Sequence, residues 1–292
     1  MAASPSRSRR ACSWRRWAGC SRRGRRRARP RSRGLGRMAG GGAPMMPEAG
    51  AERPPDVFDP RIARELVRYA RRVVARGYIH NTLGNIALRV PDPRWEGGLV
   101  YTKQAEVSLE EMTLAHVVVT DVPTGRLLHG RVPPSVGHQL NREILRLRPD
   151  VNAVIHVHHD ETIALFASGA ITALRVLSLE FPYVMGRPPH VVPSHLNVEL
   201  DVAPIRTFID RTNAIIMENH GVTTLGRTLA EAYHRLNTLT AEVRRVLLAE
   251  QLAAARGTAV RYLDPLEVDA AYAEADRVIY PSRSAPAGAT AR

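Results

Sequence analysis

Cysteine is almost absent from this sequence of 292 residues. Its two cysteines, Cys12 and Cys20, both lie in an arginine-rich segment at the start of the chain. The globular part therefore has no disulfide to stabilise it and no thiolate to bind a metal ion. Long apolar runs are also lacking, so we find neither a transmembrane helix nor the apolar core of a signal peptide. These absences predict a soluble, cytoplasmic protein without a membrane partner.

Acidic residues are missing from Met1 to Arg37, a segment that contains 14 arginines. Without these 14, the 42 basic residues become 28, which equals the 28 acidic ones, so this segment alone accounts for the formal charge of +14. It cannot bury enough apolar surface to fold by itself. Three interpretations stay open: a disordered arm that binds nucleic acid, a targeting peptide, or translated sequence upstream of a later start at Met38, Met45 or Met46.

Helix and strand patterns alternate from about residue 54 to residue 256, which predicts one α/β domain between a disordered extension (1–53) and a C-terminal segment (257–292) with a disordered end. Apolar residues at helical or alternating spacing define the expected elements. Helices are predicted within 59–77, 137–148, 160–169, 203–211 and 228–255, with a helical turn at 108–112. Strands are predicted within 84–90, 97–102, 151–158 and 213–221, with a hairpin at 115–130.

Two histidines end an apolar strand in the stretch AVIHVHHDETIALFA, residues 153–167. Because residues i and i+2 of a strand face the same side, His156 and His158 should stand side by side. Two neighbouring imidazoles make half of a tetrahedral zinc-type site. The alternative is a hydrogen-bonded core histidine followed by an unrelated loop histidine.

A third histidine lies in the stretch MENHG, where His220 follows an apolar strand and Glu218 and precedes Gly221. Ligand sites of open α/β sheets collect beyond the strand ends. Three histidines from two strands match a catalytic metal site, which has three protein ligands and one open position. An all-nitrogen ligand set suits one Zn²⁺ per subunit, and Mn²⁺, Fe²⁺ or Co²⁺ would also fit.

Three motifs in this order, GNIALR, RPDVNAVIHVH and ENHG, resemble those of the class II aldolase/adducin family, over about residues 59–251. The resemblance implies a three-layer α/β/α domain around a mainly antiparallel sheet. It also implies that His156, His158 and His220 bind the metal and that Gly84 and Asn85 contact substrate. Its members include fuculose-phosphate aldolase and ribulose-phosphate epimerase, and a homotetramer with sites at subunit interfaces is expected.

Two departures from that family pattern change the expected chemistry. The turn that resembles the phosphate-binding turn reads Thr-Lys-Gln-Ala, from Thr102 to Ala105. The position of the family's acid/base glutamate falls on Gly137, which cannot transfer a proton. His138, the next residue, is the predicted replacement as proton donor or auxiliary ligand. Alternatively, His138 is a solvent-facing residue at the start of a helix.

Polar residues near these motifs are further candidates for binding an acidic substrate. Lys103 would bind a carboxylate as a point charge and Arg131 through two hydrogen bonds, unless they are simply solvated. Thr102 belongs to the same turn as Lys103. Ser135 is either a substrate contact or a helix N-cap. His159 and Asp160 are interpreted as caps of the following helix. A structural role is also expected for the other polar candidates, which are His190, His195, Glu180 and Tyr183.

The absent glutamate favours one reaction over another. A metal with an open position polarises a substrate oxygen and stabilises enolate-like charge. Retro-aldol cleavage needs a base, whereas a carboxylate substrate can lose CO₂ without one. We therefore predict a metal-dependent carbon–carbon lyase for a small hydroxy- or keto-carboxylate, favouring decarboxylation of a hydroxylated aromatic acid. Alternatives are an aldehyde-lyase or epimerase acting on a sugar phosphate, and a binding protein similar to the adducin head.

Overall fold

The computed structural model describes residues 56–279. The arginine-rich extension and the last residues of the C-terminal segment lie outside this range, so the expectations for them stay predictions. Within the described residues, no helix combines the length and the apolar character that crossing a bilayer requires.

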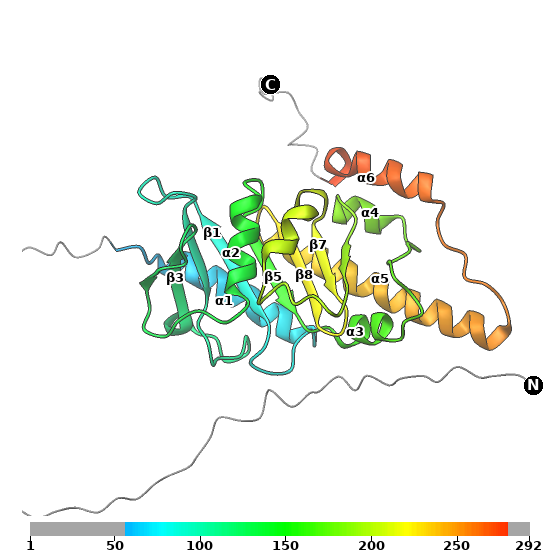
Figure 1. Cartoon of the computed structure of the whole chain (residues 1–292), viewed down its shortest axis with the longest axis horizontal. Helices are drawn as coiled ribbons and strands as arrows, with labels where there is room; N and C mark the ends of the chain where they lie inside the picture. The colour runs from blue at the N-terminus through cyan, green and yellow to red at the C-terminus, as the bar shows by residue number, and fades with distance from the viewer. Residues whose placement is uncertain (1–55, 280–292) are drawn as a thin grey trace, which may run out of the picture. The chain divides into compact units, whose positions relative to one another are not determined.

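An eight-stranded sheet forms the centre of the domain, in the order β4-β3-β2-β1-β5-β8-β7-β6 (Figure 1). Every neighbouring pair is antiparallel except β6 and β7, as expected for a mainly antiparallel sheet. The strands are β1 (Asn85–Val90), β2 (Leu99–Lys103), β3 (Val117–Asp121), β4 (Leu127–His129), β5 (Ala153–Val157), β6 (His190–Val192), β7 (Ala214–Met217) and β8 (Gly221–Gly226).

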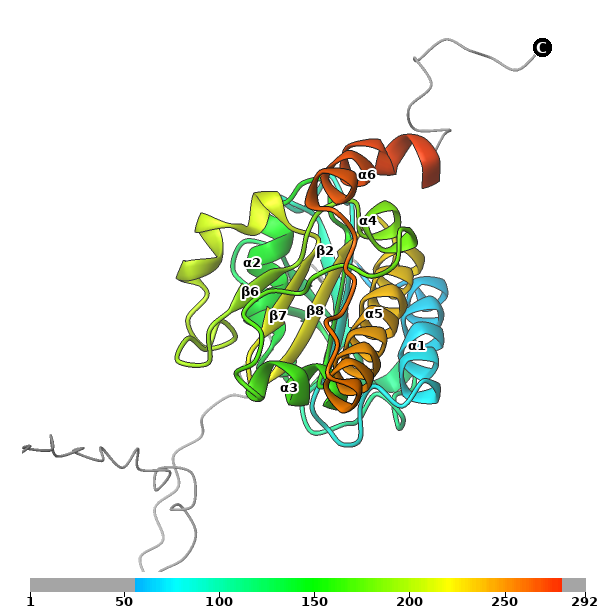
Figure 2. The ribbon, with the colours of Figure 1, turned by 90° about the vertical axis from the view of Figure 1, so that its right-hand side faces the viewer.

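Helices cover both faces of this sheet, which confirms the predicted α/β/α layers (Figure 2). On one face lie α1 (Pro60–Ala75) and α5 (Leu229–Arg256), with α3 (Asp160–Ala167) and α4 (Glu180–Met185). On the other lie α2 (His138–Leu147) and the short 3₁₀ helices η2 (Ala203–Thr207) and η3 (Ile209–Arg211). A further 3₁₀ turn, η1 (Leu114–His116), precedes β3, and α6 (Pro265–Ile279) packs on α4.

The alternation of strand side chains divides the core in two. On β5, Ile155 and Val157 pack with α1 and α5, whereas Val154 packs with α2. All three are fully buried. Because side chains alternate along a strand, His156 must face the α2 side together with Val154. We call this side of the sheet the α2 face.

Several elements differ from the sequence-based expectation. The predicted strand at 213–221 forms only β7, because the chain turns back through Asn219 at φ +58 and then continues as β8. The predicted helix at 203–211 forms only η2 and η3. At 108–112, Ser108 and Glu111 make the expected reciprocal hydrogen bonds, but only a turn follows. No sequence pattern indicated β6, β8, α4 or α6.

Candidate metal centre

Strand pairing brings the predicted histidines to one end of β5 and β8. His156 lies opposite Asn85 on β1 and opposite Thr223 on β8. His158 follows the last residue of β5, and His220 occupies the turn between β7 and β8. The antiparallel return of β8 therefore carries His220 to the end of β5 where the other two histidines lie. We call His156, His158 and His220 the histidine cluster.

The three rings of the cluster converge on one point. Their centroids are 4.9 Å apart for His156 and His158, 5.2 Å for His156 and His220, and 4.8 Å for His158 and His220. One ring nitrogen from each lies within 4.8 Å of those of the other two. Three imidazoles so placed match the protein ligands of a catalytic zinc-type site.

The hydrogen bonding of His156 fits a metal ligand. Its Nδ1 lies 3.0 Å from the Thr223 hydroxyl, which fixes the orientation of the ring. Its Nε2 is fully buried and has no hydrogen-bond partner among the described residues. Buried polar atoms are rarely left unpaired, whereas a histidine ligand typically uses one ring nitrogen for the metal and the other for an outer partner.

Burial also keeps the cluster in the protonation state that metal binding needs. Removal from water lowers the pKa of His156 to about 3 and that of His158 to about 4, because burial penalises the charged imidazolium. Both rings are thus neutral at pH 7, and a neutral imidazole is the form that binds a metal ion.

Glu199 belongs to this site and was missed in the sequence analysis. Its carboxylate lies 3.2 Å from His220 Nε2 and 3.7 Å from His156 Nε2. Burial by itself would raise the pKa of Glu199, but the hydrogen bond with His220 and the neighbouring histidines lower it to about 2, so the group is anionic. The residue lies in an irregular segment between β6 and η2, where no sequence periodicity marks it.

Gly84 and Asn85, the predicted substrate contacts, lie beside the cluster. The Asn85 side chain is buried, accepts a 2.5 Å hydrogen bond from Asn141 Nδ2 and donates one of 3.5 Å to Glu199. Gly84 has φ +79, and a Cβ there would lie 2.9 Å from Ile79 Cδ1 and 3.1 Å from the His156 carbonyl oxygen. Glycine therefore lets β1 begin close to β5.

Thr102 and Lys103 are turned into the protein. The Thr102 hydroxyl donates to the Ile86 carbonyl at 2.9 Å. The fully buried Lys103 ammonium donates to the carbonyls of Thr82 and Val107 at 2.8 and 2.5 Å, and burial lowers its pKa to about 8. This differs from the expectation that Lys103 meets a substrate carboxylate, because its hydrogen bonds hold two loops together.

His138 is buried rather than solvent-facing, and its ring does not join the cluster. Its Nε2 lies 3.0 Å from the Thr120 hydroxyl on β3. Strands β2 and β1 lie between β3 and β5, so three spacings of about 4.8 Å separate these two strands. Thr120 on β3 is therefore roughly 14 Å from β5 across the sheet. Burial lowers the pKa of His138 to about 4, helped by the charge of Arg142. Successive helical residues point about 100° apart, so His138 is directed to Thr120 although Gly137 lies beside Glu199, and its role as proton donor stays a prediction.

Ser135 and Arg131 also differ from the simplest expectations. Gly137, not Ser135, is the N-cap of α2, and it makes no side-chain capping bond. The Ser135 hydroxyl is buried without a hydrogen-bond partner among residues 56–279. Arg131 is exposed in the segment before Pro133, as a solvated cation would be.

The other polar candidates contact neighbouring side chains or lie near the surface, although the His159 side chain makes no capping hydrogen bond to α3. His159 is the N-cap residue of α3 and its Nδ1 lies 2.8 Å from the Thr162 hydroxyl, while Asp160 pairs with His80 at 2.9 Å. The His190 ring stacks on Phe208, with centroids 3.8 Å apart. The remaining three are at the surface or paired there: His195, Tyr183, and Glu180 with Arg245.

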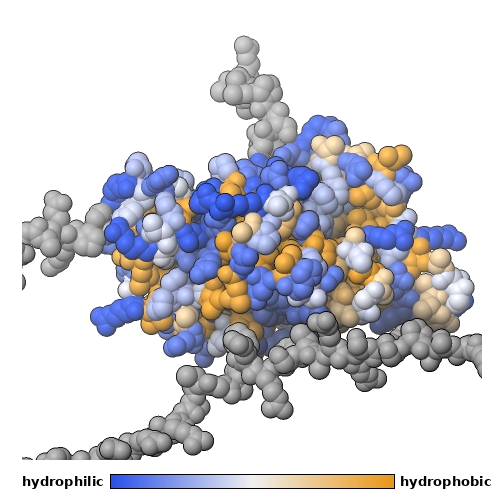
Figure 3. Space-filling view, viewed as in Figure 1, coloured by the Kyte–Doolittle hydropathy of each residue, from blue (hydrophilic) through white to orange (hydrophobic). Residues whose placement is uncertain are grey.

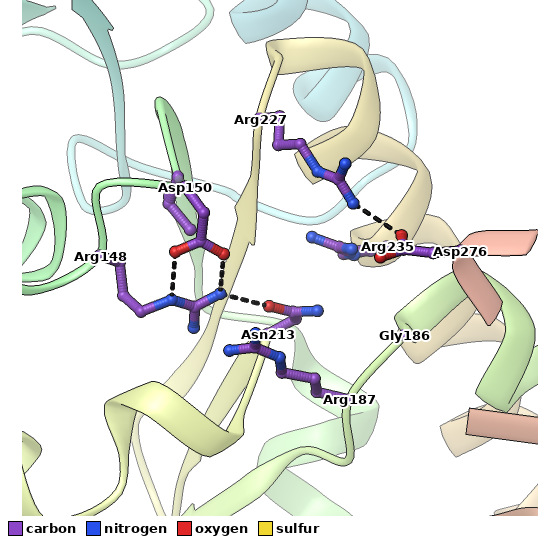
Figure 4. Close-up of a pocket in the computed structure, with 9 residues that line it drawn as sticks. Arg148, Asp150, Gly186, Arg187, Asn213, Arg227, Arg235 and Asp276 are labelled. Atoms are coloured by element: carbon purple, nitrogen blue, oxygen red, sulfur yellow. Dashed lines mark hydrogen bonds and ion pairs between the residues drawn. The ribbon is translucent and has the colours of Figure 1, made fainter. Parts of the chain in front are cut away.

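A second polar region lies at the opposite end of β5 and β8 (Figure 4). It is a cavity of about 300 Å³, which we call the arginine cavity. Its lining includes Arg148, Arg187, Arg227, Arg235, Asp150, Asn213 and Asp276. Arg148 donates to Asp150, Asn213 and the carbonyls of Ile209 and Thr212. Arg227 pairs with Asp276, Arg235 pairs with Glu231, and Arg187 donates to the Asp210 carbonyl, so each cation of the lining has a partner within the protein.

A helix-covered, mainly antiparallel sheet whose strand ends unite three histidines defines a class of α/β proteins built around a metal centre. A family model described as "Class II Aldolase and Adducin N-terminal domain" matches residues 64–245. The chain therefore belongs to the class II aldolase/adducin family, as the motifs indicated.

The proteins to which this chain is similar include aldolases, decarboxylases and a dehydratase. L-fuculose phosphate aldolase of Methanococcus maripaludis is 25% identical over 182 residues, which cover 60% of this chain and 90% of the relative. A 3,4-dihydroxyphthalate decarboxylase of Arthrobacter keyseri is 27% identical over 186 residues, covering 58% of this chain and 71% of the relative. The solved structure of an L-fuculose 1-phosphate aldolase aligns with a TM-score of 0.63 at 17% identity, covering 76% and 98% of the two chains. The structural likeness supports the fold.

Proposed function

We propose that this chain is a divalent-metal-dependent carbon–carbon lyase that decarboxylates a small hydroxylated aromatic acid. The observation that carries the proposal is the buried, unpaired Nε2 of His156, which faces two further imidazoles. An ion bound there supplies a Lewis acid that polarises a substrate oxygen. In the reaction, the bond to the carboxylate carbon breaks, CO₂ leaves, and the remaining carbon takes up one proton.

Two features of the chain favour decarboxylation over aldol cleavage. Gly137 removes the carboxylate that would act as base from α2, and a carboxylate substrate loses CO₂ without prior proton removal. Thr102 and Lys103 donate to backbone carbonyls, so neither side chain is free to bind a phosphate group. The decarboxylase relative at 27% identity supports the same reaction type.

Exposed apolar side chains next to the site residues suit an aromatic substrate. Leu83, Val136 and Leu200 adjoin Gly84, Gly137 and Glu199 in the sequence, and they are 50%, 68% and 62% exposed. Apolar surface also interrupts the charged surface on the side of the molecule seen in Figure 3. Sites for small molecules are lined mainly by apolar side chains, with a few polar groups that fix the orientation of the ligand.

A sugar-phosphate aldehyde-lyase is the second candidate, because the fuculose-phosphate aldolase relative is 25% identical. A binding protein similar to the adducin head is less suited, since three converging histidines serve no purpose in a scaffold. Zinc as the metal, a homotetramer and a cytoplasmic location stay predictions.

The deciding experiment combines metal analysis with a substrate screen. The purified full chain should contain about one divalent ion per subunit and release CO₂ from at least one hydroxyaryl carboxylate, with both properties lost in His158→Ala. Aldehyde release from sugar phosphates without CO₂ release from any acid would favour the second candidate. Absence of metal from the folded protein would refute both.

A further inference from the structure

Gly137 occupies a position where a side chain would displace two neighbouring side chains. Its φ of −64 and ψ of −3 are ordinary helical values, so the backbone conformation does not require glycine. A Cβ at this position would lie 2.2 Å from Asn85 Nδ2 and 2.3 Å from Glu199 Oε1. The Glu199 carboxylate thus fills the space that a side chain on the first turn of α2 would enter.

The Glu199 carboxylate lies close to two of the three histidines of the cluster, at distances that ligands of one metal ion have. Ligand atoms that share a tetrahedral ion with bonds of about 2.0–2.1 Å are roughly 3.3 Å apart. Its two oxygens lie 3.2 Å from His220 Nε2 and 3.7 Å from His156 Nε2. The side chain is only 13% exposed, so burial of its charge requires a positive partner.

Local packing holds Glu199 in this place. The preceding residue, Val198, is fully buried in the core of the α2 face. The Glu199 amide donates to Asn197 Oδ1 at 3.1 Å, and the Ser194 amide donates to Glu218 Oε2 at 3.1 Å. The second bond ties the segment to the turn that carries His220, so the carboxylate and this histidine are positioned together.

We propose that Glu199 is the carboxylate of the metal centre, a fourth protein ligand from the segment after β6, and that Gly137 is the residue that admits it. The inference rests on the proposed function, since it requires that the histidine cluster holds a metal ion. Zinc sites expand to five ligands, so a carboxylate ligand leaves room for a substrate oxygen. The chain keeps a carboxylate at the site although α2 no longer supplies one.

Metal binding without substrate provides the test. Zn²⁺ affinity is measured by competition with a chelator, and the visible spectrum of the Co²⁺ protein reports the ligand set. Glu199→Gln should lower Zn²⁺ affinity at least about tenfold and change the Co²⁺ spectrum. Gly137→Ala should do the same with Glu199 still present, because the added methyl group displaces the carboxylate. Glu143→Gln, which removes a similarly buried carboxylate that pairs with Arg146 on α2, should change neither property.

Moving the carboxylate sharpens the test. The double variant Gly137→Glu with Glu199→Gly returns a carboxylate to α2 and removes one of the two groups that a side chain at 137 would meet, Asn85 being the other, so its Zn²⁺ affinity should exceed that of Glu199→Gly alone. If Glu199 only pairs with a protonated histidine, Glu199→Gln will lower thermal stability but leave Zn²⁺ affinity and the Co²⁺ spectrum unchanged. That result would overturn the inference.

His158→Ala separates this inference from the proposed function. If the unmodified protein binds Zn²⁺ tightly and His158→Ala does not, the histidine centre stands, and unchanged Glu199 variants would refute the role of Glu199 alone. If the unmodified protein and His158→Ala bind Zn²⁺ equally weakly, both the inference and the proposed function fail.

Discussion

The two ends of β5 and β8 both gather titratable side chains, yet they differ in what these side chains bind. At one end, the Arg148 guanidinium donates to Asp150, Asn213 and two backbone carbonyls. At the other end, the buried His156 Nε2 has no hydrogen-bond partner within the described chain, and two further imidazoles face it.

The difference teaches how to tell a binding site from a polar packing region. Charge and a cavity are present at the arginine end, but its hydrogen-bonding capacity is used to close the ends of strands. Buried groups with unused capacity that converge on one point are costly unless a ligand completes them. By this criterion, the histidine end is the functional one.

Loss of a cluster histidine should have the largest effect. His158→Ala should lower metal affinity more than about 100-fold, the upper range for outer-shell changes, because it removes a ligand itself. Metal per subunit and CO₂ release would be measured together. His195→Ala, which removes an exposed histidine, is the matched control, and an equal loss in both variants would contradict the assignment.

The arginine end should respond in stability instead. Arg148→Ala leaves the buried carbonyls of Ile209 and Thr212 without their donor, so the free energy of unfolding should fall by about 3 kcal/mol. Urea unfolding measures this, and metal content per folded subunit should not change. A loss of metal without a loss of stability would reverse the roles of the two ends.

His138 tests whether an unpaired histidine nitrogen is sufficient for a metal site. The Nδ1 of His138 also lacks a hydrogen-bond partner among the described residues, but the three rings of the histidine cluster lie elsewhere, because His138 is directed toward Thr120. Its folded-state pKa of about 4 lies below the unfolded value near 6.5, so the unfolded chain binds an extra proton between these values. Stability from this residue is therefore complete above about pH 6.5 and is lost as the pH falls toward 4.

His138→Gln should remove that dependence. In chelator-treated protein, the slope of unfolding free energy against pH between 6 and 4.5 should fall by up to about 1.4 kcal/mol per pH unit. Metal affinity at pH 7 should stay as in the unmodified protein. Parallel pH curves for the two proteins would show that burial of His138 has no such effect.

The smallest expected effect comes from the outer partner of His156. Thr223→Val removes the hydroxyl that lies 3.0 Å from Nδ1 with little change in shape, so metal affinity should fall about tenfold. The neighbouring Thr224→Val is the control: its hydroxyl donates to the Ala232 carbonyl, and only stability should change. Equal metal affinities in the two variants would exclude the outer partner role.

Local sequence signals recovered most of the fold. Helical spacing of apolar residues located α1, α2 and α5, and Gly84 marked the position where β1 begins. Signals failed where tertiary contacts decide the structure. The segment 203–211 reads as a helix but is held as two short 3₁₀ helices, and Gly221, expected to follow the end of a strand, begins β8.

The sequence by itself determined the histidine pair, because the two-residue period of a strand places His156 and His158 on one face whatever surrounds them. It also determined that Gly137 offers no carboxylate. Only the tertiary structure decided what takes that place. His138 turns toward β3, and Glu199 arrives from a segment more than sixty residues further along the chain. Contacts of that range depend on how layers pack, and no local pattern of residues encodes them.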